Sequence, residues 1–258
     1  MPEITINNIK TSYKVFGSGT PFLILHGWNS NSDRWVEVAE IVSQKGYKVI
    51  IPDLPGFGTS EPLPLPWNTN KYIDWIEKFV KEINLEEYFL LGHSFGGALA
   101  SKMAVKHNQD VKKLFLVSAA CVRRKTTGKK FSKFLAKIFK VFYFIPFYPL
   151  IRKAVYKFII RKSDYIYVEG IMKSTYLNVV AEDLSFHLPF IRVPTIIIWG
   201  DKDDYTPINE GYFIEKQVKK SKIIVIPGAG HDLNRKQPEV LAEKVLSALG
   251  GPASGGEN

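Results

Sequence analysis

The sequence predicts an α/β protein in which a mostly parallel sheet is flanked by helices and interrupted by a helical insertion. Short apolar runs alternate with stretches of helical periodicity over residues 22–118, as expected when parallel strands are buried on both faces. This alternation stops near Cys121 and resumes at about residue 195. The 258 residues, 45% hydrophobic and 23% charged, suffice for one large domain and are unlike a disordered chain.

Each expected element follows from its local pattern. Strands are expected where short runs of aliphatic and aromatic residues are bounded by turn-forming residues, and helices where apolar residues recur three and four positions apart. The expected strands are 22–25, 49–51, 88–91, 111–118, 195–199 and 223–226. The expected helices are 33–44, 72–83, 95–107, 208–218 and 239–249.

The same pattern divides the chain into four parts. Residues 1–120 and 190–250 are predicted to form the two halves of the α/β core. Residues 121–189 are predicted to form a helical cap inserted between them, because they carry helical patterns and no convincing strand. Residues 251–258, which are rich in glycine, are expected to be a disordered tail.

The net charge of +10 is concentrated in the insertion. Thirteen of the 35 basic residues lie between Cys121 and Lys162, with no Asp or Glu among them, which leaves 22 basic and 25 acidic residues elsewhere. Aromatic residues are interleaved with these cations. Three explanations stay open: lysines on the outside of a packed cap, an amphipathic surface resting on anionic lipid, or a docking surface for an acidic carrier protein. No recognition fold accompanies the charge, so nucleic acid is not an expected partner.

Several classes of protein are disfavoured by what the sequence lacks. Cys121 is the one cysteine, so no internal disulfide can form, and no apolar leader or run of roughly 20 apolar residues is present. We therefore expect a cytoplasmic protein, with a peripheral position at a membrane surface as the alternative. No metal-ligand spacing or phosphate-binding glycine motif is found, so no metal and no cofactor are expected. The sequence carries no prediction of the oligomeric state.

The strongest chemical signal surrounds Ser94. Gly92-His93-Ser94-Phe95-Gly96 follows an expected strand and opens an expected helix, which is the context of a nucleophile elbow. A serine hydroxyl needs an adjacent base, and His231, on a glycine-rich turn after a strand, is the best candidate. A base histidine in turn needs a carboxylate to fix its tautomer. The loop after residues 195–199 offers three: Asp201, Asp203 and Asp204.

These motifs, in this order, resemble the α/β-hydrolase family, and the resemblance covers nearly all of the chain. His26-Gly27-Trp28 resembles that family's oxyanion segment, and residues 53–60 resemble its loop after the fourth strand. Residues 199–207 and 228–231 resemble its acid and histidine loops. The resemblance implies a catalytic triad of Ser94, Asp203 and His231, and so selects Asp203 among the three aspartates.

Further site residues are expected around this triad. The N–H of Phe95, directly after the nucleophile, is one candidate oxyanion donor, and the resemblance implies the N–H of Trp28 as the second. His26 and His93 are expected to be structural, with the His93 side chain pointing away from the site. The side chains proposed for a substrate pocket are those of Trp28, Phe139, Phe142 and His187.

Together these features predict a serine hydrolase that cleaves a carboxylic ester of a hydrophobic, small to medium substrate through an acyl-enzyme. Lactones, thioesters derived from acyl carriers or lipids, and C–C bonds beside a ketone are alternative substrates for the same machinery. Two non-enzymatic readings also remain. One is a ligand-binding receptor on this fold, and the other is a lipid-surface protein whose basic insertion is its main functional part.

Overall fold

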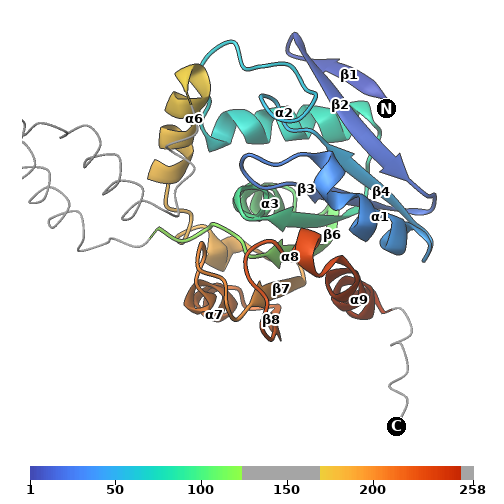
Figure 1. The fold of residues 1–258 in the computed structure, drawn as a ribbon, viewed down its shortest axis with the longest axis vertical. Helices are drawn as coiled ribbons and strands as arrows, with labels where there is room; N and C mark the ends of the chain where they lie inside the picture. The colour runs from blue at the N-terminus through green and yellow to red at the C-terminus, as the bar shows by residue number, and fades with distance from the viewer. Residues whose placement is uncertain (124–168, 251–258) are drawn as a thin grey trace, which may run out of the picture.

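A computed structural model of the chain describes residues 1–123 and 169–250. Within these residues an eight-stranded sheet has the order β1-β2-β4-β3-β5-β6-β7-β8 (Figure 1). The pairs β1–β2 and β2–β4 are antiparallel, and every other neighbouring pair is parallel. The strands are β1 (Glu3–Ile6), β2 (Ile9–Phe16), β3 (Thr20–Leu25), β4 (Tyr47–Pro52), β5 (Tyr88–His93), β6 (Val111–Val117), β7 (Thr195–Gly200) and β8 (Ser221–Ile226).

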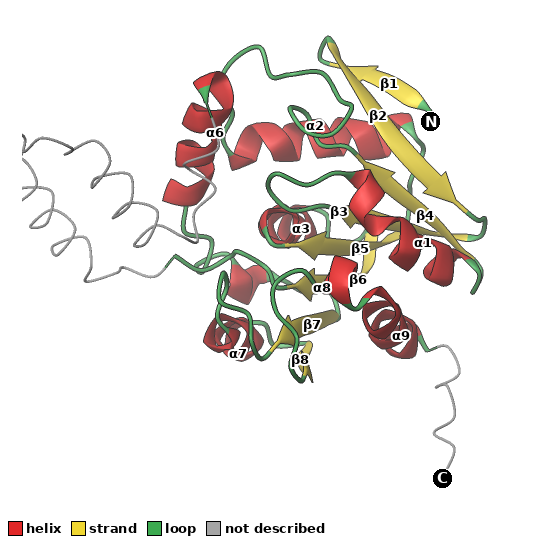
Figure 2. Cartoon of the chain, in the orientation of Figure 1, coloured by secondary structure: helices red, strands yellow, loops and turns green. Residues whose placement is uncertain are grey.

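Helices cover both faces of the sheet, as Figure 2 shows in red against the yellow strands. The alternation along β3 shows why: Leu23 and Leu25 belong to one apolar core and Phe22 and Ile24 to the other. The first core is covered by α2 (Thr69–Glu82), α3 (Phe95–Lys106) and α7 (Ile208–Gln217). The second is covered by α1 (Val36–Ser43), α8 (Leu233–Lys236) and α9 (Pro238–Leu249). The predicted mostly parallel sheet flanked by helices is thus confirmed.

The sheet begins with a hairpin, β1–β2, that was not among the strands expected from the apolar runs. Its turn is Asn7-Asn8, and both residues have positive φ angles, 53° and 60°. Consecutive asparagines in this conformation are typical of a tight hairpin turn. Thr, Ser and Lys dilute the apolar pattern of β2, which explains why the run of residues alone does not reveal it.

The predicted cap, residues 121–189, is described only at its two ends, and residues 124–168 lie outside the described residues. The two ends lie side by side. The N–H of Leu184 donates to the carbonyl of Cys121 at 3.0 Å, and the N–H of Arg123 donates to the Asp183 carboxylate at 3.2 Å. Described parts of the second end are α6 (Gly170–Ala181) and the 3-10 helix η3 (Leu188–Phe190).

An ion pair fixes this second end to the core. Lys102 of α3 contacts the carboxylate of Glu182 at 2.7 Å, with only 11% of the lysine side chain exposed. None of the helices in the described part of the chain is both long enough and apolar enough to cross a bilayer.

Candidate active site

Ser94 lies in the sharp turn between β5 and α3. Its φ of 53° and ψ of −114° are a strained conformation for a residue with a Cβ. Three backbone hydrogen bonds hold it there. The N–H of Ser94 donates to Val117 at 3.0 Å, and its carbonyl accepts from Ala98 at 3.1 Å and from Ala120 at 3.0 Å. The half-buried side chain is thereby presented at the carboxyl edge of the parallel strands.

Two glycines make this turn sterically feasible. A Cβ at Gly92 would lie 2.3 Å from the carbonyl oxygen of Gly96, and a Cβ at Gly96 would lie 2.1 Å from that of Leu25. Both distances are far below van der Waals contact, and both neighbours are backbone atoms that cannot rotate away. The glycines on either side of Ser94 therefore let the first turn of α3 pack against β5 and β3.

His231 lies between Ser94 and Asp203. Its Nε2 is 3.0 Å from Ser94 Oγ, and its Nδ1 is 2.8 Å from Asp203 Oδ2. Because a carboxylate can only accept hydrogen bonds, we assign the imidazole proton to Nδ1 and the lone pair to Nε2. The structure thus brings the three predicted residues together, although Ser94 and His231 are 137 positions apart in the sequence.

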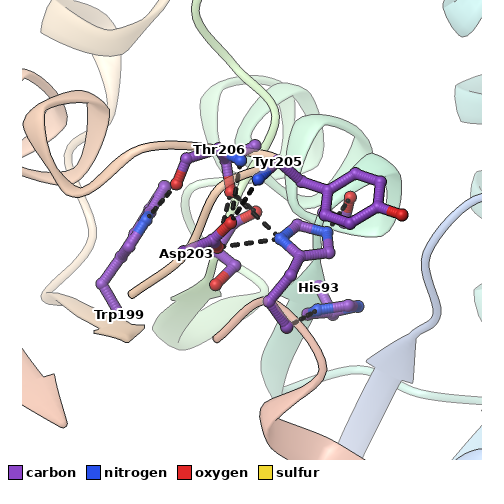
Figure 3. Close-up of polar contacts among 8 residues, drawn as sticks. His93, Trp199, Asp203, Tyr205 and Thr206 are labelled. Carbon is purple, nitrogen blue, oxygen red and sulfur yellow. Dashed lines mark hydrogen bonds and ion pairs between the residues drawn. The ribbon is translucent and has the colours of Figure 1, made fainter. Parts of the chain in front are cut away.

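The carboxylate of Asp203 is fully buried and fully hydrogen-bonded (Figure 3). Its Oδ1 accepts the backbone N–H groups of Tyr205 and Thr206, each at 2.9 Å, and its Oδ2 accepts the Thr206 hydroxyl at 2.9 Å. Burial alone would raise the pKa of Asp203, but the hydrogen bonds from His231 and Thr206 outweigh it and hold that pKa below its usual value. The acid therefore remains charged beneath the imidazole.

The two alternative aspartates of this loop occupy different positions. Asp201 is exposed, and its carboxylate accepts the N–H of Gly228 at 2.7 Å, which ties the acid loop to the histidine loop. Asp204 is exposed as well. Of the three aspartates, Asp203 is the one that accepts the hydrogen bond from His231 Nδ1.

Two further residues of the acid loop shape the site, and the sequence analysis did not single out either of them. The Thr206 hydroxyl lies within 3.2 Å of His231 Nδ1, and the indole N–H of Trp199 donates to the Thr206 carbonyl at 2.7 Å. The ring of Tyr205 stacks on the imidazole of His231, with centroids 5.1 Å apart. A threonine three residues after an aspartate is a local turn signal that could have revealed Thr206. No comparable local signal exists for Tyr205.

Two buried neutral histidines support the site. His93 donates from Nε2 to the carbonyl of His231 at 3.0 Å, and burial lowers the pKa of His93 to about 3. The expectation that His93 points away from the site is therefore wrong, because its ring contacts the loop that carries the base. His26 donates from Nδ1 to Gly27 and accepts at Nε2 from Leu54, and burial lowers its pKa to about 4. It fixes the predicted oxyanion segment, as expected.

The two predicted oxyanion donors are available for a ligand. The first helical hydrogen bond of α3 runs from the N–H of Ala98 to the carbonyl of Ser94. The N–H of Phe95 lies in the first turn of the helix and therefore has no acceptor within α3. Among the described residues, no acceptor is bonded to the N–H of Trp28 or of Phe95. The indole of Trp28 packs edge-on against Phe57, Phe95 and Tyr176, which holds this segment in place.

A cavity of about 310 Å³ opens beside Ser94 and His231. Its apolar wall is formed by Trp28, Phe95, Ala120, Tyr176, Val179 and Val180. Trp28 thus lies where the sequence placed it, whereas Phe139 and Phe142 lie outside the described residues. His187 is not among the described residues that line the cavity. Its ring instead lies against Phe186, with centroids 4.2 Å apart.

No metal site accompanies this arrangement in the described part of the chain. Within residues 1–123 and 169–250, no three side chains of His, Cys, Asp or Glu are grouped so that they could hold an ion. The imidazole of His231, 3.0 Å from the Ser94 hydroxyl, is placed to transfer a proton to and from it.

A serine, a buried aspartate and a histidine in this chain order, at the carboxyl edge of a mostly parallel sheet, define an α/β protein with the site architecture of a hydrolase. Comparison with known proteins agrees. The family model described as the alpha/beta hydrolase fold matches residues 20–144. The chain has the α/β-hydrolase fold.

Individual relatives extend the similarity beyond that segment. The AB hydrolase superfamily protein YisY of Bacillus subtilis is 28% identical over 248 residues, which cover 87% of this chain and 90% of that protein. Lipase 1 of Psychrobacter immobilis is 26% identical, with 83% of this chain and 72% of that one covered. The crystal structure of a putative lipase from Acinetobacter baumannii superposes with a TM-score of 0.75 at 22% identity, covering 96% and 90% of the two chains. This last similarity concerns the fold.

Proposed function

We propose that the protein is a serine hydrolase that cleaves a carboxylic ester bond, with Ser94 as nucleophile, His231 as general base and acid, and Asp203 as the acid that orients the histidine. The observation that carries this proposal is the continuous hydrogen-bond chain from Ser94 Oγ through His231 to the buried Asp203 carboxylate, at 3.0 and 2.8 Å. The strained backbone of Ser94 supports it as well, since strain is commonly stored at functional residues.

The geometry suits a two-step reaction. His231 Nε2 takes the Ser94 proton as Oγ attacks the ester carbonyl, and the N–H groups of Trp28 and Phe95 are the proposed donors to the oxyanion. His231 then protonates the leaving alcohol and the acyl-enzyme forms. In the second step His231 activates a water molecule that hydrolyses the acyl-enzyme. Asp203 stays charged and stabilises the imidazolium in both steps.

The cavity supports a small to medium substrate with a hydrophobic portion. At about 310 Å³ it is at the lower end of the usual range for small-molecule sites. Aromatic and aliphatic side chains form its wall next to the nucleophile, where an acyl chain would lose water on binding.

Two measurements on wild type and Ser94→Ala test the proposal. The first is labelling by a fluorophosphonate probe, which reacts with an activated serine; we expect labelling of wild type and none of Ser94→Ala. The second is turnover of p-nitrophenyl esters of graded chain length, alongside a lactone, a thioester and a substrate with a C–C bond next to a ketone.

The outcomes separate the alternatives. Preferred turnover of the esters supports the proposal, whereas preferred turnover of another substrate class retains the triad and replaces the ester. A folded wild-type protein that is neither labelled nor active on any of these compounds would contradict the enzymatic proposal and favour a ligand-binding role.

A further inference from the structure

The arginines of the described chain are gathered around the cavity next to Ser94. Residues 1–123 and 169–250 contain four of them, Arg34, Arg123, Arg192 and Arg235, and all but Arg192 line this cavity. None of the lysines in the same residues lines it, although lysine is the more common cation in this chain. The difference is chemical, because a guanidinium presents a planar fork of donors that matches an oxyanion group, and an ammonium does not.

One of the three cavity arginines already has partners. The guanidinium of Arg123 donates to the carbonyl oxygens of Glu182 and Val179, at 3.2 and 3.4 Å, and so caps the end of α6. The guanidinium of Arg123 is therefore engaged in joining the two described ends of the predicted cap.

Within residues 1–123 and 169–250, Arg34 and Arg235 have no such partner. Among the described residues, no carboxylate lies within ion-pair distance, 4.0 Å, of either guanidinium. The nearest acid in sequence to Arg34 is Asp33, and its carboxylate pairs with Lys14 at 2.9 Å. The one acid among the described lining residues is Asp232. The described lining therefore carries three cations against a single carboxylate.

A buried contact holds the two unpaired arginines on the same side of the cavity. Arg34 belongs to the 3-10 helix η1 (Ser32–Trp35), and Arg235 belongs to α8, and these two elements contact each other. The amide of Asn234, which is only 4% exposed, donates to the carbonyl of Arg34 at 2.8 Å across 200 positions of sequence. This buried hydrogen bond fixes the backbones that carry Arg34 and Arg235, while both arginines are themselves exposed.

We propose that Arg34 and Arg235 bind an anionic group of the substrate, a carboxylate or a phosphate, while the apolar wall receives the part of the substrate next to the ester. This inference rests on the proposed hydrolase function and names its substrate class: an amphiphilic ester with an oxyanion group. Two charge-assisted, fork-shaped contacts would fix the orientation of such a substrate relative to Ser94.

The test compares matched esters. Wild type, Arg34→Gln and Arg235→Gln are assayed with 4-nitrophenyl hexanoate, with the mono-4-nitrophenyl ester of adipic acid, and with a phosphate-bearing 4-nitrophenyl ester of similar length. Arg192→Gln is the matched control, because Arg192 is exposed like Arg34 and Arg235 but does not line the cavity. We expect the ratio of kcat/KM for an anionic over the neutral ester to fall about tenfold in each cavity variant and to be unchanged in the control. High salt should weaken the wild-type preference in the same direction.

Two results would overturn the inference: a ratio that is the same in Arg34→Gln and Arg235→Gln as in wild type, or a ratio that falls as much in Arg192→Gln. A larger loss on the carboxylate ester or on the phosphate ester identifies which group is bound. Failure of the hydrolase proposal is recognised separately, because wild type would then turn over none of the three esters. In that case the inference is tested by calorimetry, which compares the affinity for the adipate ester of Ser94→Ala with that of the double variant Ser94→Ala/Arg235→Gln. No binding, or equal binding, contradicts the inference.

Discussion

Replacing Asp203 by asparagine should abolish most activity while leaving the fold intact, and the structure gives the reason atom by atom. Oδ1 accepts two backbone N–H groups, so the asparagine must place its carbonyl oxygen there. Its NH2 group then occupies the position of Oδ2, 2.8 Å from His231 Nδ1. Because that NH2 group donates, Nδ1 must become an acceptor and the imidazole proton must move to Nε2.

The consequence falls on the nucleophile. A protonated Nε2, 3.0 Å from Ser94 Oγ, can donate to the serine but cannot take its proton. The opposite amide orientation would set the NH2 group against two N–H donors, so the enzyme cannot escape by rotating the side chain. We expect kcat/KM to fall by roughly 10⁴, which corresponds to about 5.5 kcal/mol of lost transition-state stabilisation.

The assay is ester hydrolysis by Asp203→Asn, with circular dichroism to confirm the fold and fluorophosphonate labelling to follow the nucleophile. Asp201→Asn is the matched control, because Asp201 bonds Gly228 and not the imidazole, and its activity should stay within about threefold of wild type. An Asp203→Asn protein that is folded and retains a tenth or more of wild-type kcat/KM would refute this tautomer argument.

Three more predictions follow from the packing and protonation of the site. Gly96→Ala should lower the free energy of unfolding by about 3 kcal/mol, because its Cβ would meet a backbone carbonyl at 2.1 Å. Gly230→Ala, whose Cβ would find its nearest neighbour at 3.9 Å, should cost less than about 0.5 kcal/mol in the same urea titration. Burial lowers the pKa of His26 to about 4 and that of His93 to about 3. Near pH 5 the unfolded chain therefore binds nearly two more protons than the folded chain. Stability should fall with falling pH there by about 2.7 kcal/mol per unit, and by half as much in His93→Gln; equal slopes would argue against this. Thr206→Val should lose about 2 kcal/mol of stability and reduce kcat, whereas Thr206→Ser, which keeps the hydroxyl, should behave nearly as wild type. A loss in Thr206→Ser as large as that in Thr206→Val would contradict the role assigned to the hydroxyl.

Local patterns in the sequence were sufficient to predict most of the core. Apolar runs marked β3 to β8, because the central residues of these strands are aliphatic or aromatic, and in β3 to β7 most of them are buried. The antiparallel hairpin β1–β2 lies at the edge of the sheet and has a mixed pattern, so only its Asn7-Asn8 turn could have indicated it. The positions of Ser94, Asp203 and His231 at strand ends could be predicted as well, because the apolar runs show where the strands end.

Contacts between segments far apart in the chain could not be predicted from the sequence. The contact of His93 with the His231 carbonyl and the position of His187 away from the cavity depend on how separate loops meet above the sheet. The placement of Arg34 and Arg235 at one cavity is a stronger example. The two residues are 201 positions apart in the sequence, and the contact between η1 and α8, including the Asn234 hydrogen bond, brings their backbones together.

As the pH falls, protonation of His26 should weaken the anchoring of the predicted oxyanion segment. Asp203 keeps its charge to a pH below its usual pKa, because His231 and Thr206 donate to it. His26 takes up a proton at a pH of about 4, although burial opposes it. Once protonated, its Nε2 becomes a donor that faces the N–H donor of Leu54, which it accepts in the neutral form at 3.0 Å. Two donors cannot share that position, so the segment that carries the proposed oxyanion donor Trp28 loses an anchor while the acid of the triad is still ionised.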